Sequence, residues 1–343
     1  MHGLYLLWWV QEKHIPAPTL AVLLAVGDLA LMALEVPTGW FADKFGHRKS
    51  LIAGSAVQVV GMLLCWLGQG VPGVLAASLL VALGDALRSG ADQALLYRTC
   101  LALDRETDFQ RIQGQTYAWQ AVALLIQVLA GGFIVQRWGF AAGWIVETIL
   151  CAIGLGISCA MVEPPSASDT RSESVYRTAD GGDARPTLHP RASSFRFIAL
   201  MMPAAFVASG HTATAFLVQT MGGSSAAQMT WLVAAIVLAE AIGSAIATGA
   251  RDAGLRIQVA IGLFGALTLV IGLAVRPLLV PSAIVLSLLD GLALPLRSVA
   301  IQRLANDAVR ARAASLASAC DMALKTIALP LAGSWRGRLR FPK

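Results

Sequence analysis

The chain has 343 residues, of which 57% are apolar and only 13% are charged, and its mean hydropathy is +0.67. A soluble domain carries about 25% charged residues, so this composition excludes one large soluble core and predicts an integral membrane protein. The net charge of +6 is small for this length, and the Lys and Arg residues cluster between apolar runs. Such a distribution argues against nucleic-acid binding, which needs a basic face with aromatic residues.

Ten apolar stretches are long enough to cross a bilayer, whose core of about 30 Å needs about 20 residues per helix. Their apolar runs are continuous rather than alternating, which predicts helices and not barrel strands. In chain order the stretches are Thr19–Ala42, Leu51–Leu67, Val74–Thr99, Gln113–Val135, Phe140–Val162, Phe197–Thr220, Met229–Ala250, Arg256–Val275, Leu278–Arg303 and Arg312–Gly333.

Both ends of the chain are abrupt. The segment GLYLLWWV, within the first 18 residues, is too short to span and is expected to be the outer end of a first helix. No apolar run follows Gly333. We therefore expect most of a first helix and all of a last helix to be missing.

The connecting segments predict the orientation. Twenty Lys and Arg residues lie in one alternating set of connections and three lie in the other. Cytoplasmic loops carry the positive excess, so the first set, with Lys44 and the central linker, is expected in the cytoplasm.

The longest polar break predicts two halves. Residues 163–195 are rich in Ser, Pro, Arg and Asp without an apolar period, which is typical of a flexible linker. It separates an N-terminal half, 1–162, from a C-terminal half, 196–333, and a basic tail follows at 334–343. Each half contains five spans, so one restored helix at each end gives two pseudo-symmetric halves of six helices.

The segment EVPTGWFADKFGHRK, from Glu35 to Lys49, follows the first of these spans. It resembles the signature loop between the second and third helices of the major facilitator superfamily. The residues that match this signature are Gly39, Phe41, Ala42, Asp43, Lys44, Gly46, Arg48 and Lys49. The segments EVPTG, SGADQALLY (89–97) and RAASLAS (312–318) resemble one large bacterial subgroup of this family.

The resemblance implies the major facilitator fold, an all-α polytopic membrane protein in the inner (plasma) membrane of a bacterium. It also implies that the loop is a latch between the two halves, favouring one of two access states. The residues themselves leave a simpler alternative, a loop that only sets orientation. Gly46 can take φ > 0 in a tight turn, and Asp43 can accept hydrogen bonds from free N–H groups at a helix N-terminus or pair with an Arg.

Charged residues inside the spans are candidates for a substrate or proton pathway, because charge is costly in the bilayer. Asp28 and Glu35 are seven residues apart, on one helical face. Asp85, Arg88 and Asp92 also share a face, and a structural salt-bridge cluster is an equal alternative. The second half adds Asp290 with Arg297, an Asp321–Lys325 pair at i, i+4, and Glu240. The pathway set is Asp28, Glu35, Asp85, Arg88, Asp92, Glu240, Asp290 and Arg297.

These features predict a secondary active transporter that moves a small solute by alternating access, coupled to a proton gradient. The alternative is a truncated, non-transporting relative that acts as a membrane receptor or scaffold, or is inactive. We expect no enzyme, because no catalytic constellation is evident, and neither a cofactor nor a metal. The expected partners are the solute, protons and the lipid bilayer, and the chain is expected to be a monomer.

Overall fold

The structure is a computed structural model that describes residues 4–89, 91–105, 108–164, 192–220, 225–248, 255–304 and 307–338. The described residues form helices and no strand. The helices are α1 (Tyr5–Gln11), α2 (Ala17–Phe45), α3 (His47–Leu67), α4 (Gly70–Arg88), α5 (Ala91–Ala102), α6 (Phe109–Ala160), α8 (Ala192–Gln219), α9 (Ala226–Thr248), α10 (Leu255–Ala274), the short 3-10 helix η3 (Arg276–Leu278), α11 (Leu279–Leu304) and α12 (Asp307–Arg338).

Gly46 separates α2 from α3 in a turn of one residue. Its φ of 102° and ψ of 145° lie in a region that only glycine adopts easily, and its N–H donates to the carbonyl of Ala42. A Cβ at this position would lie 2.6 Å from the Oε2 atom of Glu163. The prediction of a positive φ at Gly46 is confirmed, and the close approach of Glu163 is a second requirement for glycine.

The bounds of two helices differ from those of the expected spans, and in each case a small residue lies at the difference. Helix α6 bends at Gly139, where φ is 81°, so it contains the two predicted spans on either side of residues 136–139. The third predicted span, Val74–Thr99, is not one continuous helix. Helix α4 ends at Ser89, whose ψ of 125° is extended, and α5 starts at Ala91. Serine is a weak helix former whose side chain competes for backbone groups, which favours a break here.

Seven helical segments of the described residues are long and apolar enough to cross a membrane. The one in α6 has 39 residues, which corresponds to about 58 Å of helix and therefore to about two crossings. Helices α8 and α12 are not among the seven, so crossing by these two stays a prediction. On α10, the apolar side chains of Leu263 and Val270 are 68% and 63% exposed, as expected for a surface that faces lipid.

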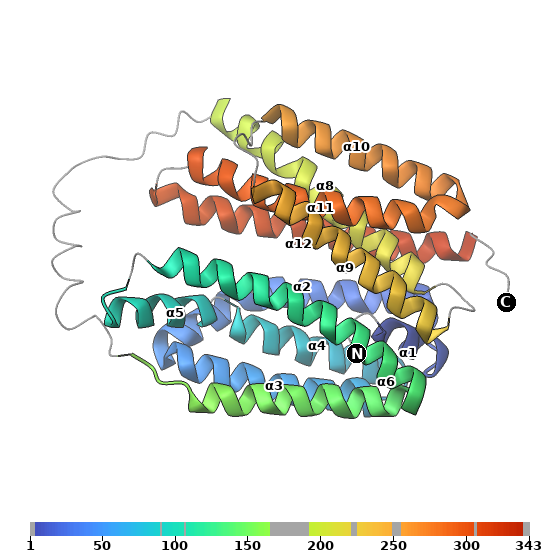
Figure 1. Cartoon of the computed structure of the whole chain (residues 1–343), viewed down its shortest axis with the longest axis horizontal. Coiled ribbons are helices and arrows are strands. Elements are labelled where there is room, and N and C mark those ends of the chain that lie inside the picture. Colours follow the sequence, from blue (N-terminus) through green and yellow to red (C-terminus); the bar gives the residue numbers. More distant parts are fainter. Residues whose placement is uncertain are drawn as a thin grey trace.

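The helices form two bundles, which lie one above the other in Figure 1. In the N-terminal bundle, α3 packs on α4 and α6, and α2 packs on α4. In the C-terminal bundle, α11 packs on α8 and α9, and α8 also packs on α10 and α12. The main contacts between the bundles are those of α2 with α12, α6 with α9 and α1 with α8.

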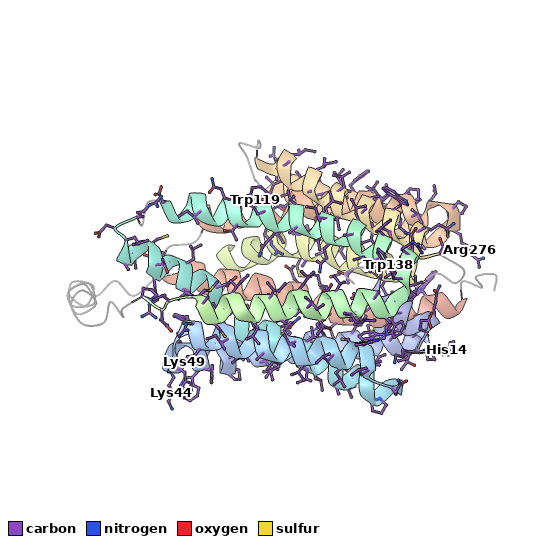
Figure 2. All side chains as sticks on the ribbon, turned by 60° about the horizontal axis from the view of Figure 1, so that its bottom comes forward. His14, Lys44, Lys49, Trp119, Trp138 and Arg276 are labelled. Atoms are coloured by element: carbon purple, nitrogen blue, oxygen red, sulfur yellow. The ribbon has the colours of Figure 1, made fainter. Side chains whose placement is uncertain are left out.

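The two ends of the molecule differ in the residues that they present. Lys44 and Lys49 lie at one end, and His14, Trp138 and Arg276 lie at the opposite end (Figure 2). We call these the Lys44 end and the His14 end. At the Lys44 end the ammonium group of Lys44 lies 4.6 Å from the centre of the Trp40 ring, a pairing that suits a membrane–water boundary.

Candidate functional site: a polar cavity, an ion-pair group and two closures

A polar cavity of about 570 Å³ lies within the N-terminal bundle. A second cavity, of about 550 Å³, adjoins it on the side of the Lys44 end and shares with it Gln58, Asp85, Arg88, Gln127, Glu147 and Cys151. Asp28 lines the first cavity and Asp92 the second. The structure therefore brings four of the predicted pathway residues together: Asp28, Asp85, Arg88 and Asp92.

The predicted shared helix face of Asp85, Arg88 and Asp92 is wrong in detail, because the chain breaks at Ser89 between the second and the third of them. All three still line the second cavity. The Nη1 atom of Arg88 lies 3.9 Å from Oδ1 of Asp85, and both side chains are nearly half exposed. This distance is too long for a hydrogen bond, so the pair is a loose one.

Glu147 is a cavity residue that sequence reasoning placed outside the pathway set. The Nε2 atom of Gln127 lies 3.0 and 3.1 Å from its two carboxylate oxygens. Both residues belong to α6, on opposite sides of the bend at Gly139. The bend therefore folds the helix back on itself and puts Glu147 against Gln127, a proximity that 20 residues of sequence separation conceal.

Glu35 does not share this position. Its side chain is exposed on α2, and it is absent from the described residues that line the two cavities. Its neighbour Thr38 is buried and donates to the carbonyl oxygens of Leu34 and Ala86, which fastens α2 to α4.

The C-terminal bundle contains the remaining predicted pathway residues. His211 on α8 and Asp290 on α11 are joined by a contact of 3.1 Å between Nδ1 and Oδ2. Glu240 on α9 interacts electrostatically with both of them and with Lys325 on α12. Lys325 also acts on Asp28 of the other bundle. Lys325 is thus the cation common to Asp28 and Glu240, and it connects the two bundles electrostatically.

Arg297 has a different role from its predicted neighbours on α11. Its Nη1 and Nη2 atoms each lie 2.6 Å from one carboxylate oxygen of Asp321, a bidentate pair that joins α11 to α12. The predicted pairing of Asp321 with Lys325 is therefore wrong. The planar guanidinium matches both oxygens of a carboxylate at once, whereas an ammonium group acts as a single point charge.

At the Lys44 end, Glu163 binds the signature loop. It accepts hydrogen bonds from the backbone N–H of His47 and Arg48, at 2.8 and 3.3 Å, and lies 3.6 Å from Arg98. The predicted acceptor, Asp43, belongs instead to the last turn of α2, where it is exposed and pairs with none of the described residues. A carboxylate suits this place because the first N–H groups of α3 lack partners and carry the positive end of the helix dipole.

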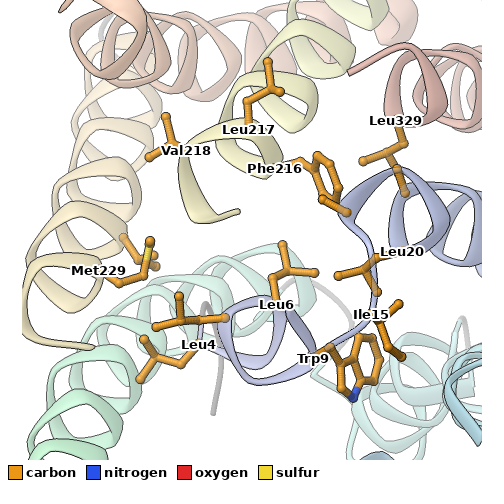
Figure 3. Packing of buried hydrophobic residues seen from close by; sticks show 14 of the residues in the cluster. Leu4, Leu6, Trp9, Ile15, Leu20, Phe216, Leu217, Val218, Met229 and Leu329 are labelled. Carbon is orange, nitrogen blue, oxygen red and sulfur yellow. The ribbon is translucent and has the colours of Figure 1, made fainter. Parts of the chain in front are cut away.

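At the His14 end the bundles meet through apolar side chains (Figure 3). Leu6, Leu20, Phe216, Met229 and Leu329 are buried in one cluster drawn from α1, α2, α8, α9 and α12. Glycines bring the helix backbones close together there. A Cβ on Gly132 of α6 would overlap Thr230 of α9, and one on Gly333 of α12 would lie 2.8 Å from the Cβ of Ala21 on α2.

Comparison with known proteins agrees with this arrangement. The sequence profile of the Major Facilitator Superfamily matches residues 1–329. Two MFS-type transporters named ppzB, from Metarhizium rileyi (strain RCEF 4871) and Metarhizium majus (strain ARSEF 297), are 24% and 25% identical over 152 and 154 residues. These stretches are 43% and 44% of this chain but only 30% and 32% of the relatives, so the chain matches about a third of their length.

Solved structures share the fold. The nucleoside transporter NupG, the D-xylose-proton symporter and a variant of the peptide transporter POT superpose with TM-scores of 0.64, 0.64 and 0.67 at 15%, 15% and 14% identity. The superpositions cover 97%, 97% and 98% of this chain and 84%, 84% and 90% of those chains. At such identity the likeness establishes the fold alone.

Fold and site together define a multi-pass membrane protein with ionisable residues gathered between apolar outer surfaces. The match over residues 1–329 identifies its family: the chain belongs to the major facilitator superfamily. The predicted all-α major facilitator fold is thereby confirmed.

Proposed function

We propose that the chain is a secondary active transporter that moves a small solute by alternating access and is driven by a proton gradient. The observation that carries this proposal is the uneven contact between the bundles. Apolar side chains and glycines join them at the His14 end, whereas the polar cavities and the His211–Asp290 and Arg297–Asp321 pairs lie within the individual bundles. Apolar contacts of this kind can separate and re-form without leaving buried polar groups unpaired.

The two bundles are the moving bodies in this scheme, and residues 163–195 link them. The excess of Lys and Arg in the connections on one side supports a cytoplasmic Lys44 end. The closed His14 end then faces outward, and the structure corresponds to a state that is shut to the outside. A bacterial plasma membrane is supported by the resemblance of the EVPTG segment to a bacterial subgroup. We infer a monomer, because one chain contributes both bundles.

The signature loop is proposed to act as the latch at the Lys44 end. Gly46 and Glu163 hold α3 against the end of α6, and the Arg48 guanidinium donates to the carbonyl of Cys159 at 2.7 Å. Gly39, Asp43, Lys44 and Lys49 complete the motif on the exposed side. Asp43 is exposed beside this fixed loop, so it is available to contact the C-terminal bundle when the Lys44 end closes.

Proton coupling is proposed for the group formed by His211, Asp290 and Glu240, with Lys325 between it and Asp28. A His–Asp contact beside a further carboxylate offers neighbouring sites for one proton. Protonation of Glu240 would release Lys325 toward Asp28, so a change in the C-terminal bundle would alter the charge of the solute cavity. Coupling to protons is also stated for one structural neighbour, the D-xylose-proton symporter.

Reconstitution of the purified chain in proteoliposomes tests the proposal. Radiolabelled amines, sugars, nucleosides and dipeptides are offered with and without an imposed pH gradient. We expect at least one class to accumulate with the gradient and to leak out when a protonophore is added. If no class moves under either condition, the chain is a non-transporting relative instead.

A further inference from the structure

We infer that the cavity of the N-terminal bundle binds an organic cation that carries an aromatic or other flat apolar group. This inference rests on the proposed function, and it names the class of solute.

The charge of the cavity favours a cation. Four carboxylates and one guanidinium are present among the described residues that line the two cavities: Asp28, Asp85, Asp92, Glu147 and Arg88. A cationic solute reduces the excess of negative charge, whereas an anionic solute increases it.

Unpaired polar atoms supply a second and independent reason to expect a ligand. The indole Nε1 of Trp144 and the hydroxyl of Ser78 are buried and have no hydrogen-bond partner among the described residues. Trp144 is 2% exposed, and both residues line the first cavity. Buried polar groups are nearly always paired in folded proteins, so a ligand in this cavity can supply the partners that these two lack.

The position of the aromatic residues defines the shape of that ligand. Tyr5 and Trp9, from α1, line the cavity beside the apolar cluster of the His14 end, and Trp144 lies near them on α6. Asp85 and Arg88 are at the opposite end of the same cavity, where α4 ends. An apolar ring fits among the aromatic side chains, and an ammonium group then points toward the carboxylates. The volume of about 570 Å³ suits a ligand of drug-like size.

Asp28 and Glu147 are the expected counter-charges. The Gln127 amide donates to both oxygens of Glu147, which fixes the orientation of this carboxylate in the cavity. Asp28 has no described cation within 4 Å, and Lys325 acts on it from farther away while also acting on Glu240. A bound cation can therefore lie against Asp28 without displacing Lys325 from a direct contact.

Binding to the full chain in detergent micelles, measured by isothermal titration calorimetry, tests the inference without requiring transport. The probes share an indole ring and differ in charge: tryptamine, tryptophol and indole-3-acetate. Phenethylamine and tetraphenylphosphonium extend the cationic series. We expect tryptamine to bind at least tenfold more tightly than tryptophol, and indole-3-acetate to bind most weakly.

Variants test which carboxylates of the cavity interact with the bound cation. Glu147→Gln and Asp28→Asn should each weaken tryptamine binding about tenfold and leave tryptophol binding unchanged, and Glu12→Gln, an exposed carboxylate outside the cavities, should change neither. Equal or tighter binding of indole-3-acetate, or no binding of any cation to the unaltered chain, would overturn the inference. Cation binding without gradient-driven flux would contradict only the transport proposal, and flux of a solute without cation binding would contradict only this inference.

Discussion

The Glu163 carboxylate accepts a hydrogen bond of 2.8 Å from the backbone N–H of His47, across 116 residues of sequence. The same side chain lies close to Arg98 and fills the space beside Gly46. This one carboxylate, which follows the fifth predicted span, therefore fixes the turn that precedes the second. The conformation of the signature loop depends on this contact as much as on its own residues.

Replacing Glu163 with Gln should loosen the turn. A charged acceptor at a helix N-terminus is worth about 1 kcal/mol, so we expect stability in mixed-micelle SDS unfolding to fall by about that amount. Glu12→Gln serves as the matched control, because Glu12 is exposed. A Glu163→Gln chain as stable as this control would mean that the contact contributes nothing.

Gly46 and Gly39 should respond differently to alanine. At Gly46 an alanine needs φ near 102° and places its Cβ 2.6 Å from Glu163, so we expect a loss of about 1–3 kcal/mol. At Gly39 a Cβ meets nothing within 4 Å, and the helical position favours alanine by about 0.5–1 kcal/mol. Unfolding of the two variants side by side checks this order. If Gly39→Ala keeps its stability but loses transport, Gly39 makes its contact in the opposite access state.

Asp43 should matter for motion and not for folding. It is exposed and has no partner among the described residues, so Asp43→Asn should leave membrane insertion and unfolding unchanged. As a latch residue it should still lower the rate of uptake severalfold. Rates of uptake in proteoliposomes decide the question, and a rate equal to that of the unaltered chain would remove the latch role.

The Arg297–Asp321 pair is expected to be structural. Both side chains are largely buried, and breaking such a pair from one side costs about 3–5 kcal/mol, because the other charge stays buried. Arg297→Gln and Asp321→Asn should each destabilise strongly, and the double variant should recover much of that loss. A double variant that unfolds like the unaltered chain but fails to transport would return Arg297 to the pathway.

Glu240 should be required for coupling to protons but not for movement of the solute across the membrane. Glu240→Gln removes a protonation site that interacts with His211, Asp290 and Lys325. We expect accumulation against a gradient to disappear, while exchange of labelled for unlabelled solute continues at a similar rate. Accumulation that survives in this variant would show that Glu240 does not carry the coupled proton.

Much of the fold could be predicted from the sequence, because long apolar runs leave helices as the only solution in lipid. The turn at Gly46 and the bend near Gly139 were also predictable, since glycine marks positions where L-residues are strained. The break at Ser89 was not predicted, because the polar stretch from Asp85 to Gln93 was interpreted as the charged face of one continuous span. The tertiary partners of polar residues were the hardest feature to predict. Glu163, for example, follows the last apolar residues of its span, so the sequence assigns it to the linker.

The candidate site shows the same limit. Periodicity placed Asp28, Asp85 and Arg88 inside spans, and the structure gathers them around one cavity. Periodicity could not show that Gln127 would lie against Glu147 after the bend, or that Arg297 would pair with Asp321 on another helix. Such choices depend on distances between helices, which no periodicity within one helix encodes.

Reciprocal movement of the two ends tests alternating access most directly. One pair of spin labels, at Arg137 and Ser225, spans the two bundles at the His14 end. A second pair, at Leu103 and Arg256, spans them at the Lys44 end. The labels are placed in a chain whose five free cysteines have been replaced: Cys65, Cys100, Cys151, Cys159 and Cys320. Gly132→Val then acts as a wedge, because a side chain there overlaps Thr230.

Electron–electron double resonance in lipid nanodiscs gives the distance distributions of both pairs. Alternating access predicts that Gly132→Val lengthens the distance at the His14 end and shortens the one at the Lys44 end. Lengthening at the His14 end with an unchanged or longer distance at the Lys44 end would contradict it.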